Sequence, residues 1–303
     1  MVSSVAMSEP IEGVEGMISV MIPCQEDDIL LFPTVSSIFR NQVCSQDFEV
    51  LLIRSHDFLV PEKVSQFPVK VYSGSFDCQA QALNSGLNLA RGNIVCTTKP
   101  GCVVAPDWLG EIDEFFQQNP EVDGVGGPVL PSSDYGTEIQ RLASEIFNEE
   151  QGFPDSMTIL GIGNFRGLLH ATNSAFRTEA IKEIGFDECL DYDYDFDICW
   201  KMVRKRHHLV YNPRMRVRYI FPLNLRSLLK RYYCWGKEKI ILQKRYAHGI
   251  PLKSLFYTPY NTVRALLEPS PLVSTKKLLR FVQHLAFNAG SIRGYGLRIS
   301  SCV

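Results

Sequence analysis

The chain has 303 residues, of which 45% are hydrophobic and 21% are charged. This composition is typical of a globular protein with a substantial core, and it excludes disordered, collagen-like and coiled-coil chains. The formal net charge of −2 conceals an asymmetry, because residues 1–200 carry 10 basic and 31 acidic side chains, whereas residues 201–303 carry 21 and 2. Such a basic segment predicts either an anionic partner or neutralisation of one part of the chain by the other.

Neither a membrane-spanning segment nor a secretion signal is recognisable. No run approaches the roughly 20 apolar residues that cross a bilayer. The first residues, MVSSVAMSEPIEGVEG, lack the basic start and apolar run of a signal peptide. The nine Cys form no CxxC pair, so their spacing favours neither a zinc site nor a disulfide framework. We therefore expect a cytosolic protein with buried, reduced thiols.

Strand-like and helix-like segments alternate in the first hundred residues, after a tail at 1–16 that we expect to be disordered. Short apolar runs rich in Val and Ile predict buried strands at 17–24, 49–54, 69–74 and 93–98. Helical spacing lies between them at 29–42 and at 82–92, where Gly92 is expected to close the helix. The order β-α-β-β-α-β predicts an α/β fold with a mainly parallel sheet, whose ligands bind beyond the carboxyl ends of the strands.

The rest of the chain reads as further helices and short strands. The predicted elements are helices at 106–120, 176–185, 196–207, 224–249, 253–268 and 274–290, a Gly-rich strand or edge at 122–131, and strands at 209–213 and 216–221. We expect an α/β domain over residues 17–220, followed by a basic helical region over residues 221–303.

Four blocks of the sequence, spread over roughly residues 17–250, resemble the family-2 glycosyltransferases of the GT-A fold. They are ISVMIPCQEDD, ALNSGLNLARGNIVCTTKPGCVVAPDWL, HATNSAFRTEAIKEIGFDECL and DYDFDICWKMVRKRHHLVYNP. In the family these blocks form the donor-binding loop, the stretch around Asp-x-Asp, the acceptor-side segment and the Glu-Asp-x-Asp-x-Cys-Trp helix. The resemblance implies a Rossmann-like domain, its mainly parallel sheet flanked by helices, with a basic helical C-terminal extension. It also implies inverting transfer of a sugar from a nucleotide-sugar donor to a carbohydrate or lipid-linked acceptor.

The resemblance assigns roles to individual residues. Asp195 aligns with the catalytic base, a carboxylate that takes the proton of the acceptor hydroxyl. The same residue is also a candidate cap of the helix that it begins, and the two roles are compatible. The residues on the acceptor side are Asn173, Tyr194 and Trp200. The residues on the donor side are Pro23, Gln25, Glu26, Arg54, Asn84, Lys99, Lys230 and Arg231.

The chain departs from the family pattern where a metal is normally held. Residues 98–101, Thr-Lys-Pro-Gly, stand in place of Asp-x-Asp, so a divalent ion has no carboxylate there. Tyr219 stands in place of the His expected after the Trp helix. On the donor side, Arg54 replaces an acidic residue and Leu83 replaces the Arg of Arg-Asn-x-Gly. A metal cofactor is therefore doubtful.

Three interpretations remain open at this point. In the first, Lys99, helped by Lys230 or Arg231, stabilises the departing diphosphate, and the transferase needs no cofactor. In the second, donor binding has decayed and the protein is a non-catalytic homologue that binds a sugar, a lipid or a partner.

The third interpretation concerns residues 221–303, where apolar side chains interleave with Lys and Arg. This pattern is typical of helices at an anionic membrane surface, which would place the protein at the inner face of the membrane. The same pattern is also found in helices that pack on a core. No nucleic-acid-binding motif accompanies the charge, so we expect no nucleic-acid partner.

Overall fold

The computed structural model describes residues 14–24, 30–40, 47–55, 59–132, 136–150, 153–161, 169–220, 224–246 and 275–297. The chain divides into two compact units. Unit 1 comprises residues 1–129, 153–188 and 198–218. Unit 2 comprises residues 130–152, 189–197 and 219–303.

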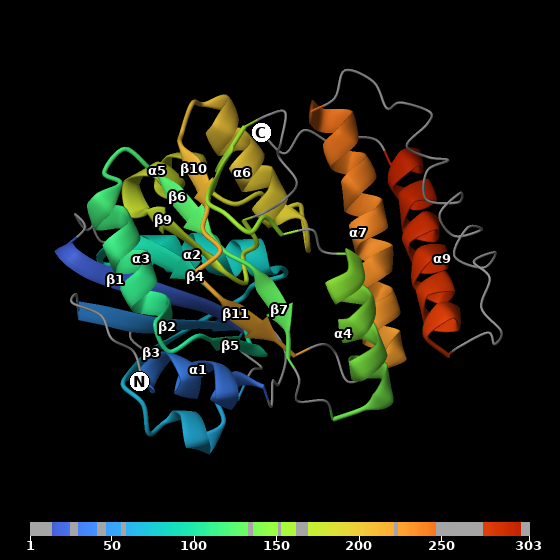
Figure 1. Cartoon of the computed structure of the whole chain (residues 1–303), viewed down its shortest axis with the longest axis horizontal. Coiled ribbons are helices and arrows are strands. Elements are labelled where there is room, and N and C mark those ends of the chain that lie inside the picture. The colour runs from blue at the N-terminus through green and yellow to red at the C-terminus, as the bar shows by residue number, and fades with distance from the viewer. Residues whose placement is uncertain are drawn as a thin grey trace. The chain divides into compact units, whose positions relative to one another are not determined.

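A largely parallel sheet forms the centre of unit 1 (Figure 1). Its eight strands among the described residues follow the order β3-β2-β1-β4-β9-β6-β10-β8. They are β1 (Val14–Cys24), β2 (Asp47–Ser55), β3 (Val69–Gly74), β4 (Gly92–Thr97), β6 (Gly124–Gly126), β8 (Thr158–Leu160), β9 (Ser174–Arg177) and β10 (Leu209–Tyr211). β1 to β4 pair in parallel, as do β6 and β10, whereas β9 runs antiparallel to β4 and β6 and β8 runs antiparallel to β10. The predicted α/β fold is confirmed.

Helices flank this sheet (Figure 1). They are α1 (Leu31–Phe39), the 3-10 helix η1 (Glu62–Val64), α2 (Gln79–Leu89), α3 (Trp108–Gln118), α5 (Thr178–Ile184) and α6 (Tyr194–Arg204), whose first four residues belong to unit 2. A three-stranded sheet has the order β5 (Cys102–Val104), β11 (Val217–Tyr219), β7 (Val129–Pro131). The expectation that Gly92 closes a helix is wrong. It begins β4, which pairs with β1. The position favours glycine, because a Cβ there would lie 2.6 Å from the carbonyl oxygen of Met17 on β1.

The central strands of unit 1 are buried along continuous runs, 18–24 on β1 and 49–53 on β2, as expected for a sheet covered on both faces. An acid on β2, Glu49, is buried among these residues. Its carboxylate accepts hydrogen bonds from the Ser19 hydroxyl at 2.7 Å, from the Arg91 backbone N–H at 2.9 Å and from Lys70 Nζ at 2.6 Å. Burial raises the pKa of Glu49, but these donors outweigh burial and hold that pKa below its ordinary value.

Unit 2 contains three described helices, α4 (Glu138–Glu150), α7 (Leu225–Tyr246) and α9 (Thr275–Gly296), and none of the helices in the described part of the chain is long and apolar enough to cross a bilayer. The basic helices predicted at 224–249 and 274–290 are confirmed, and the one predicted at 253–268 lies outside the described residues. α7 and α9 lie side by side (Figure 1) and approach so closely that a Cβ at Gly236 or Gly290 would overlap backbone of the other helix.

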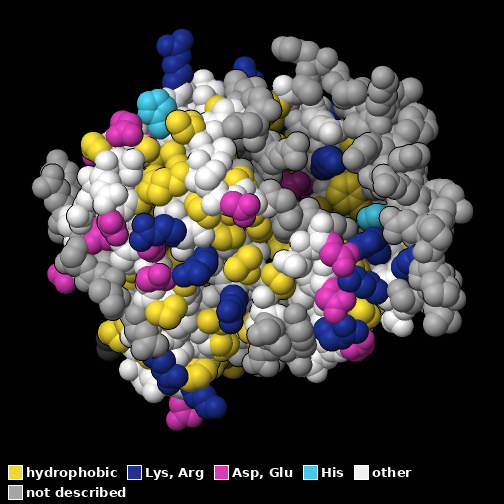
Figure 2. Space-filling view, viewed as in Figure 1, with side chains coloured by type: hydrophobic (Ala, Val, Ile, Leu, Met, Phe, Trp, Pro, Cys, Tyr) yellow, Lys and Arg dark blue, Asp and Glu magenta, His cyan; other side chains and the backbone are white. Residues whose placement is uncertain are grey.

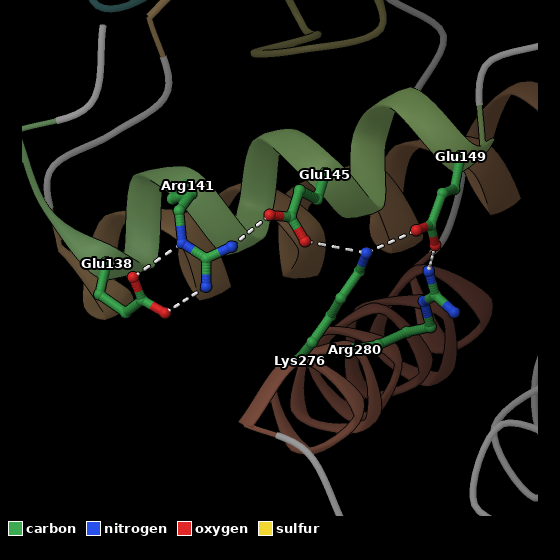
Figure 3. A network of polar contacts seen from close by, with 6 residues as sticks. All are labelled: Glu138, Arg141, Glu145, Glu149, Lys276 and Arg280. Atoms are coloured by element: carbon green, nitrogen blue, oxygen red, sulfur yellow. Dashed lines mark hydrogen bonds and ion pairs between the residues drawn. The ribbon is translucent and has the colours of Figure 1, made fainter. Parts of the chain in front are cut away.

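Acidic and basic side chains alternate over α4 and α9 (Figure 2), and we call this set the α4–α9 ion network. Lys276 Nζ lies 3.0 Å from Glu145 and also binds Glu149, which Arg280 contacts as well (Figure 3). Basic side chains from the last hundred residues thus pair with acids from the first two hundred inside unit 2. Neutralisation within the chain therefore accounts for part of the charge asymmetry.

Candidate functional site: a cationic sheet edge and an anchored carboxylate

The carboxyl ends of β1, β2 and β4 lie at one edge of the sheet in unit 1, because β1 pairs in parallel with both neighbours. Pro23 is the penultimate residue of β1, and Arg54 on β2 pairs with Cys24, the last residue of β1. Lys99 follows two residues after Thr97, where β4 ends. Three of the predicted donor-side residues, Pro23, Arg54 and Lys99, therefore come from the edge at which open α/β sheets bind ligands.

This edge presents cations. Arg54 donates from Nε to the Ser73 hydroxyl on β3 at 2.8 Å, and its side chain is half-buried. Lys99 is also half-buried, and its carbonyl accepts a hydrogen bond from Cys102 N–H at 3.0 Å, which closes the turn that carries it. An anion is the chemical complement of such an edge.

A divalent ion does not fit the turn after β4. Hard cations bind carboxylate and other oxygen ligands, but the Thr98 side chain is buried and its hydroxyl donates to the Thr172 carbonyl at 3.1 Å. Residues 99–101 supply no carboxylate. Within the described ranges, no three His, Cys, Asp or Glu side chains lie together in a way that could hold a metal ion.

Asn84, predicted on the donor side, lies on α2 and fastens the segment after α5. Its Nδ2 donates to the Phe186 carbonyl at 2.9 Å and to Glu188 at 2.8 Å, while its Oδ1 accepts from Phe186 N–H at 2.8 Å. Its amide is thus engaged with the protein itself. Gln25 and Glu26, also predicted on the donor side, lie outside the described residues.

Asn173, predicted on the acceptor side, is wholly buried. Its Oδ1 accepts from Trp108 Nε1 at 2.8 Å, and its Nδ2 donates to the carbonyls of Pro128 and Met215 at 3.0 and 2.7 Å. The side chain joins three segments of unit 1 in the core. Trp200, the other predicted acceptor-side residue in unit 1, lies half-buried on α6.

Asp195 lies in the first turn of α6, within unit 2. The side chain is half-buried, and its Oδ1 accepts from Phe196 N–H at 2.8 Å, so part of its hydrogen-bonding capacity serves the helix start. Tyr194, which precedes it, is buried. A carboxylate at a helix N-terminus is stabilised by the helix dipole, and a half-buried one remains accessible for proton transfer.

The segment before Asp195 is bound by a carboxylate from α7. Glu238, wholly buried, accepts hydrogen bonds from the backbone N–H groups of Asp191 at 3.1 Å, Tyr192 at 2.9 Å and Asp193 at 2.9 Å. Burial raises the pKa of Glu238, although these three donors oppose the shift. The pKa of Asp193 is raised well above its ordinary value, first by burial and then by the charges of Asp195 and Glu238.

Arg231, predicted on the donor side, points to Tyr219, the residue that the resemblance sets at the position of a His. Its guanidinium donates to the Tyr219 hydroxyl and lies 5.2 Å from the centre of that ring. Burial lowers the pKa of Arg231, but the neighbouring tyrosines Tyr219, Tyr192 and Tyr232 together outweigh burial, so the pKa is raised overall. Lys230, the other donor-side residue predicted on α7, is exposed.

Sequence reasoning did not identify Glu238 as a site residue. A signal was present, because Glu238 is one of two acids among residues 201–303 and lies within a basic helix. It also did not identify the contacts of Asp197, which is buried and accepts hydrogen bonds from the Tyr246 hydroxyl and from Arg245 Nη1 at 3.2 Å.

No family model matches the sequence, and no curated protein sequence matches it. Several solved structures, in contrast, are similar to this chain. The chain is similar to the mannosyltransferase PcManGT from Pyrobaculum calidifontis, solved in complex with GDP-Man and Mn2+, with a TM-score of 0.63, 14% identity and coverage of 92% of this chain and 87% of that one. It is also similar to S. aureus TarS 1-349 in complex with UDP, with a TM-score of 0.51, 11% identity and coverage of 93% of both chains. The described architecture and these structures together give the chain the GT-A-like fold of glycosyltransferases.

Proposed function

We propose that this protein is an inverting glycosyltransferase that moves a sugar from a nucleotide-sugar donor to a carbohydrate or lipid-linked acceptor. The observation that carries the proposal is the placement of Asp195, a half-buried carboxylate in the first turn of α6. Two further features support it: the cationic edge at Arg54 and Lys99, and a fold shared with a mannosyltransferase solved with GDP-Man and Mn2+ and with TarS solved with UDP.

In the proposed reaction the acceptor oxygen attacks the anomeric carbon, and the bond from that carbon to the diphosphate oxygen breaks. Asp195 takes the proton of the acceptor hydroxyl, and the nucleoside diphosphate leaves with the bonding electrons. Lys99 and Arg54 stabilise the charge that develops on the departing diphosphate. Because the turn after β4 offers no carboxylate, we propose that Lys99 acts in place of a metal ion. Activity should therefore survive EDTA.

A thermal-shift panel tests donor binding first, with nucleoside diphosphates and nucleotide sugars, each with EDTA or with Mn²⁺. Stabilisation by one nucleotide in both conditions is expected, because a ligand that binds the native state raises its apparent stability. A shift that requires Mn²⁺ would contradict the metal-independent part of the proposal. The alternative, a non-catalytic homologue, is favoured if no nucleotide produces a shift.

With the donor known, Asp195→Asn tests the base. The substitution should lower kcat about 100- to 10,000-fold, the usual contribution of a general base, and leave the melting temperature unchanged. Asp191→Asn is the matched control, because Asp191 lies in the same segment, is exposed and has Lys237 Nζ at 3.8 Å. Undiminished transfer by Asp195→Asn would remove Asp195 from the mechanism.

A second candidate function is binding to an anionic membrane surface, and one observation on α9 favours it. Leu278, Leu285 and Ile292 recur on one face of the helix and are 53%, 47% and 71% exposed, with exposed Arg293 adjacent. Sedimentation with anionic liposomes at low and high salt tests it, with Ile292→Ser as the variant. Binding that neither salt nor this substitution weakens would exclude α9 as the membrane-binding face.

A further inference from the structure

We propose that Glu238 is a positioning residue for Asp195: its buried carboxylate binds the backbone of residues 191–193 and thereby fixes the first turn of α6. The inference rests on the proposed function, since it concerns the base of that reaction. Successive backbone N–H groups converging on one anion form a nest, a recurrent anion-binding arrangement. Here the anion is a side chain of the same unit, with three contacts between 2.9 and 3.1 Å.

The held segment continues directly into the helix that carries the base. The Asp193 carbonyl accepts the hydrogen bond of Asp197 N–H at 3.0 Å, which is the first hydrogen bond of α6. Asp195 lies between these two residues. A displacement of the backbone at Asp193 is therefore transmitted to Asp195 through the helix ladder.

α7 binds the segment a second time, beyond Asp195. Asp197 is wholly buried and accepts hydrogen bonds from Arg245 and Tyr246, about two helical turns along α7 from Glu238. The base thus lies between two attachments to one helix. Such fixation restricts the carboxylate to a narrow set of positions, which is the requirement for efficient proton transfer from a bound hydroxyl.

The chemistry of the contact requires a carboxylate. An ionised Glu accepts hydrogen bonds at both oxygens, whereas Gln presents one acceptor oxygen and one NH₂ donor. Glu238 uses Oε1 for Asp191 and Oε2 for Tyr192 and Asp193. In Glu238→Gln, an NH₂ group would face at least one backbone N–H, so at least one contact of the nest would become repulsive. Lys237 Nζ lies 3.7 Å from Glu238, and burial of this acid is tolerated because the backbone donors satisfy it.

The test is performed on the full-length chain. Glu238→Gln should lower kcat about 100-fold, the effect of a small misplacement of a catalytic group, with less than about threefold change in the KM for the donor. Glu238→Asp, which retains two acceptor oxygens, should recover part of the kcat. Amide hydrogen exchange of a peptide spanning residues 191–193 should accelerate in Glu238→Gln. Glu183→Gln is the matched control, because this carboxylate is exposed on α5 in unit 1.

The outcomes separate the two proposals. Wild-type activity that Asp195→Asn abolishes, together with unchanged kcat in Glu238→Gln, overturns the inference and leaves the proposed function intact. Equal loss of kcat in Glu238→Gln and Glu238→Asp, with no change in exchange at 191–193, also overturns it. Absence of transfer in the wild type with every donor overturns both. If Glu238→Gln does not fold, Glu238→Asp carries the test, and an unchanged kcat and unchanged exchange in that variant overturn the inference.

Discussion

Two buried glutamates, Glu49 in unit 1 and Glu238 in unit 2, are bound by different kinds of partner. The side chain of Glu49 is 4% exposed and that of Glu238 is 0% exposed, and both accept hydrogen bonds from the backbone. Two cations, Lys70 and Arg91, contact Glu49, and its pKa is lowered. Glu238 is bound mainly by backbone N–H groups, and its pKa is raised. The comparison shows two uses of a buried carboxylate. At Glu49, cations compensate a charge that joins strands of the sheet, whereas at Glu238 the carboxylate accepts backbone hydrogen bonds and holds residues 191–193 in place.

The largest loss of stability is expected when the charge of Glu49, which Lys70 and Arg91 compensate, is removed. Glu49→Ala should lower the free energy of unfolding of unit 1 by about 3 kcal/mol, because the Ser19 hydroxyl and the Arg91 N–H lose their buried acceptor. Urea denaturation measures the loss. Lys70→Met is the control and should cost about 1 kcal/mol or less, since Lys70 is 39% exposed. Equal costs for the two variants would contradict the interpretation that Glu49 is the centre of this network.

A second variant tests whether the position of α7, rather than Glu238 alone, maintains the other site. Gly290→Ala places a methyl group against the Tyr233 carbonyl on α7, which should separate α9 from α7 at a cost of about 2 kcal/mol. Hydrogen exchange should increase at residues 191–193, while exchange in β2 around Glu49 stays unchanged. Increased exchange in both places would show that the two regions are not independent.

Much of the fold was predictable because its elements carry clear periodicity. The central strands are runs of buried apolar residues, and the helices at 79–89, 108–118 and 225–246 show amphipathic spacing. The strands β5 and β8, with three residues each, are too short to show a period, and β9 takes its place between β4 and β6 from long-range pairing.

Prediction of the site was less complete, and the reason is physical. The position of Asp195 at the start of a helix was predictable from the sequence around it, because a helix start is a local property. The roles of Asn173 and Glu238 depend on which segments meet in space, and no local pattern encodes that. The fold also brings together Arg231 and Tyr219, which are 12 positions apart in the sequence.

The two glutamates also predict opposite dependences of stability on pH. The folded-state pKa of Glu49 is below the ordinary 4.5, so its contribution is complete above pH 4.5 and is lost as pH falls through the folded-state pKa. The folded-state pKa of Glu238 is above 4.5, so protonation of Glu238 favours the folded state, and this stabilisation is complete below pH 4.5 and is lost as pH rises through the folded-state value.

Urea unfolding of Glu49→Gln and Glu238→Gln against wild type, at intervals from pH 3 to pH 8, measures both dependences. The stability difference for Glu49→Gln should shrink only below pH 4.5, whereas that for Glu238→Gln should change only above it. Asp193 reinforces the second trend, because its pKa is raised as well, first by burial and then by the charges of Asp195 and Glu238. If both stability differences changed over the same pH range, the contrast between the two glutamates would be contradicted.

The smallest effect is expected at the α4–α9 ion network, where charges are compensated as at Glu49 but in contact with solvent. Glu149, which binds Lys276 and Arg280, is 50% exposed, so water already screens the attraction. Glu149→Gln should lower the free energy of unfolding by about 0.2–1 kcal/mol at low salt, and the difference should vanish near 1 M NaCl, where the Debye length is about 3 Å. The cost of Glu49→Ala should persist at the same salt concentration, because buried pairs are screened much less. If high salt reduced the costs of Glu149→Gln and Glu49→Ala alike, burial would not be what distinguishes Glu49 from the α4–α9 ion network. The difference between them would then reduce to the number of cations around each acid.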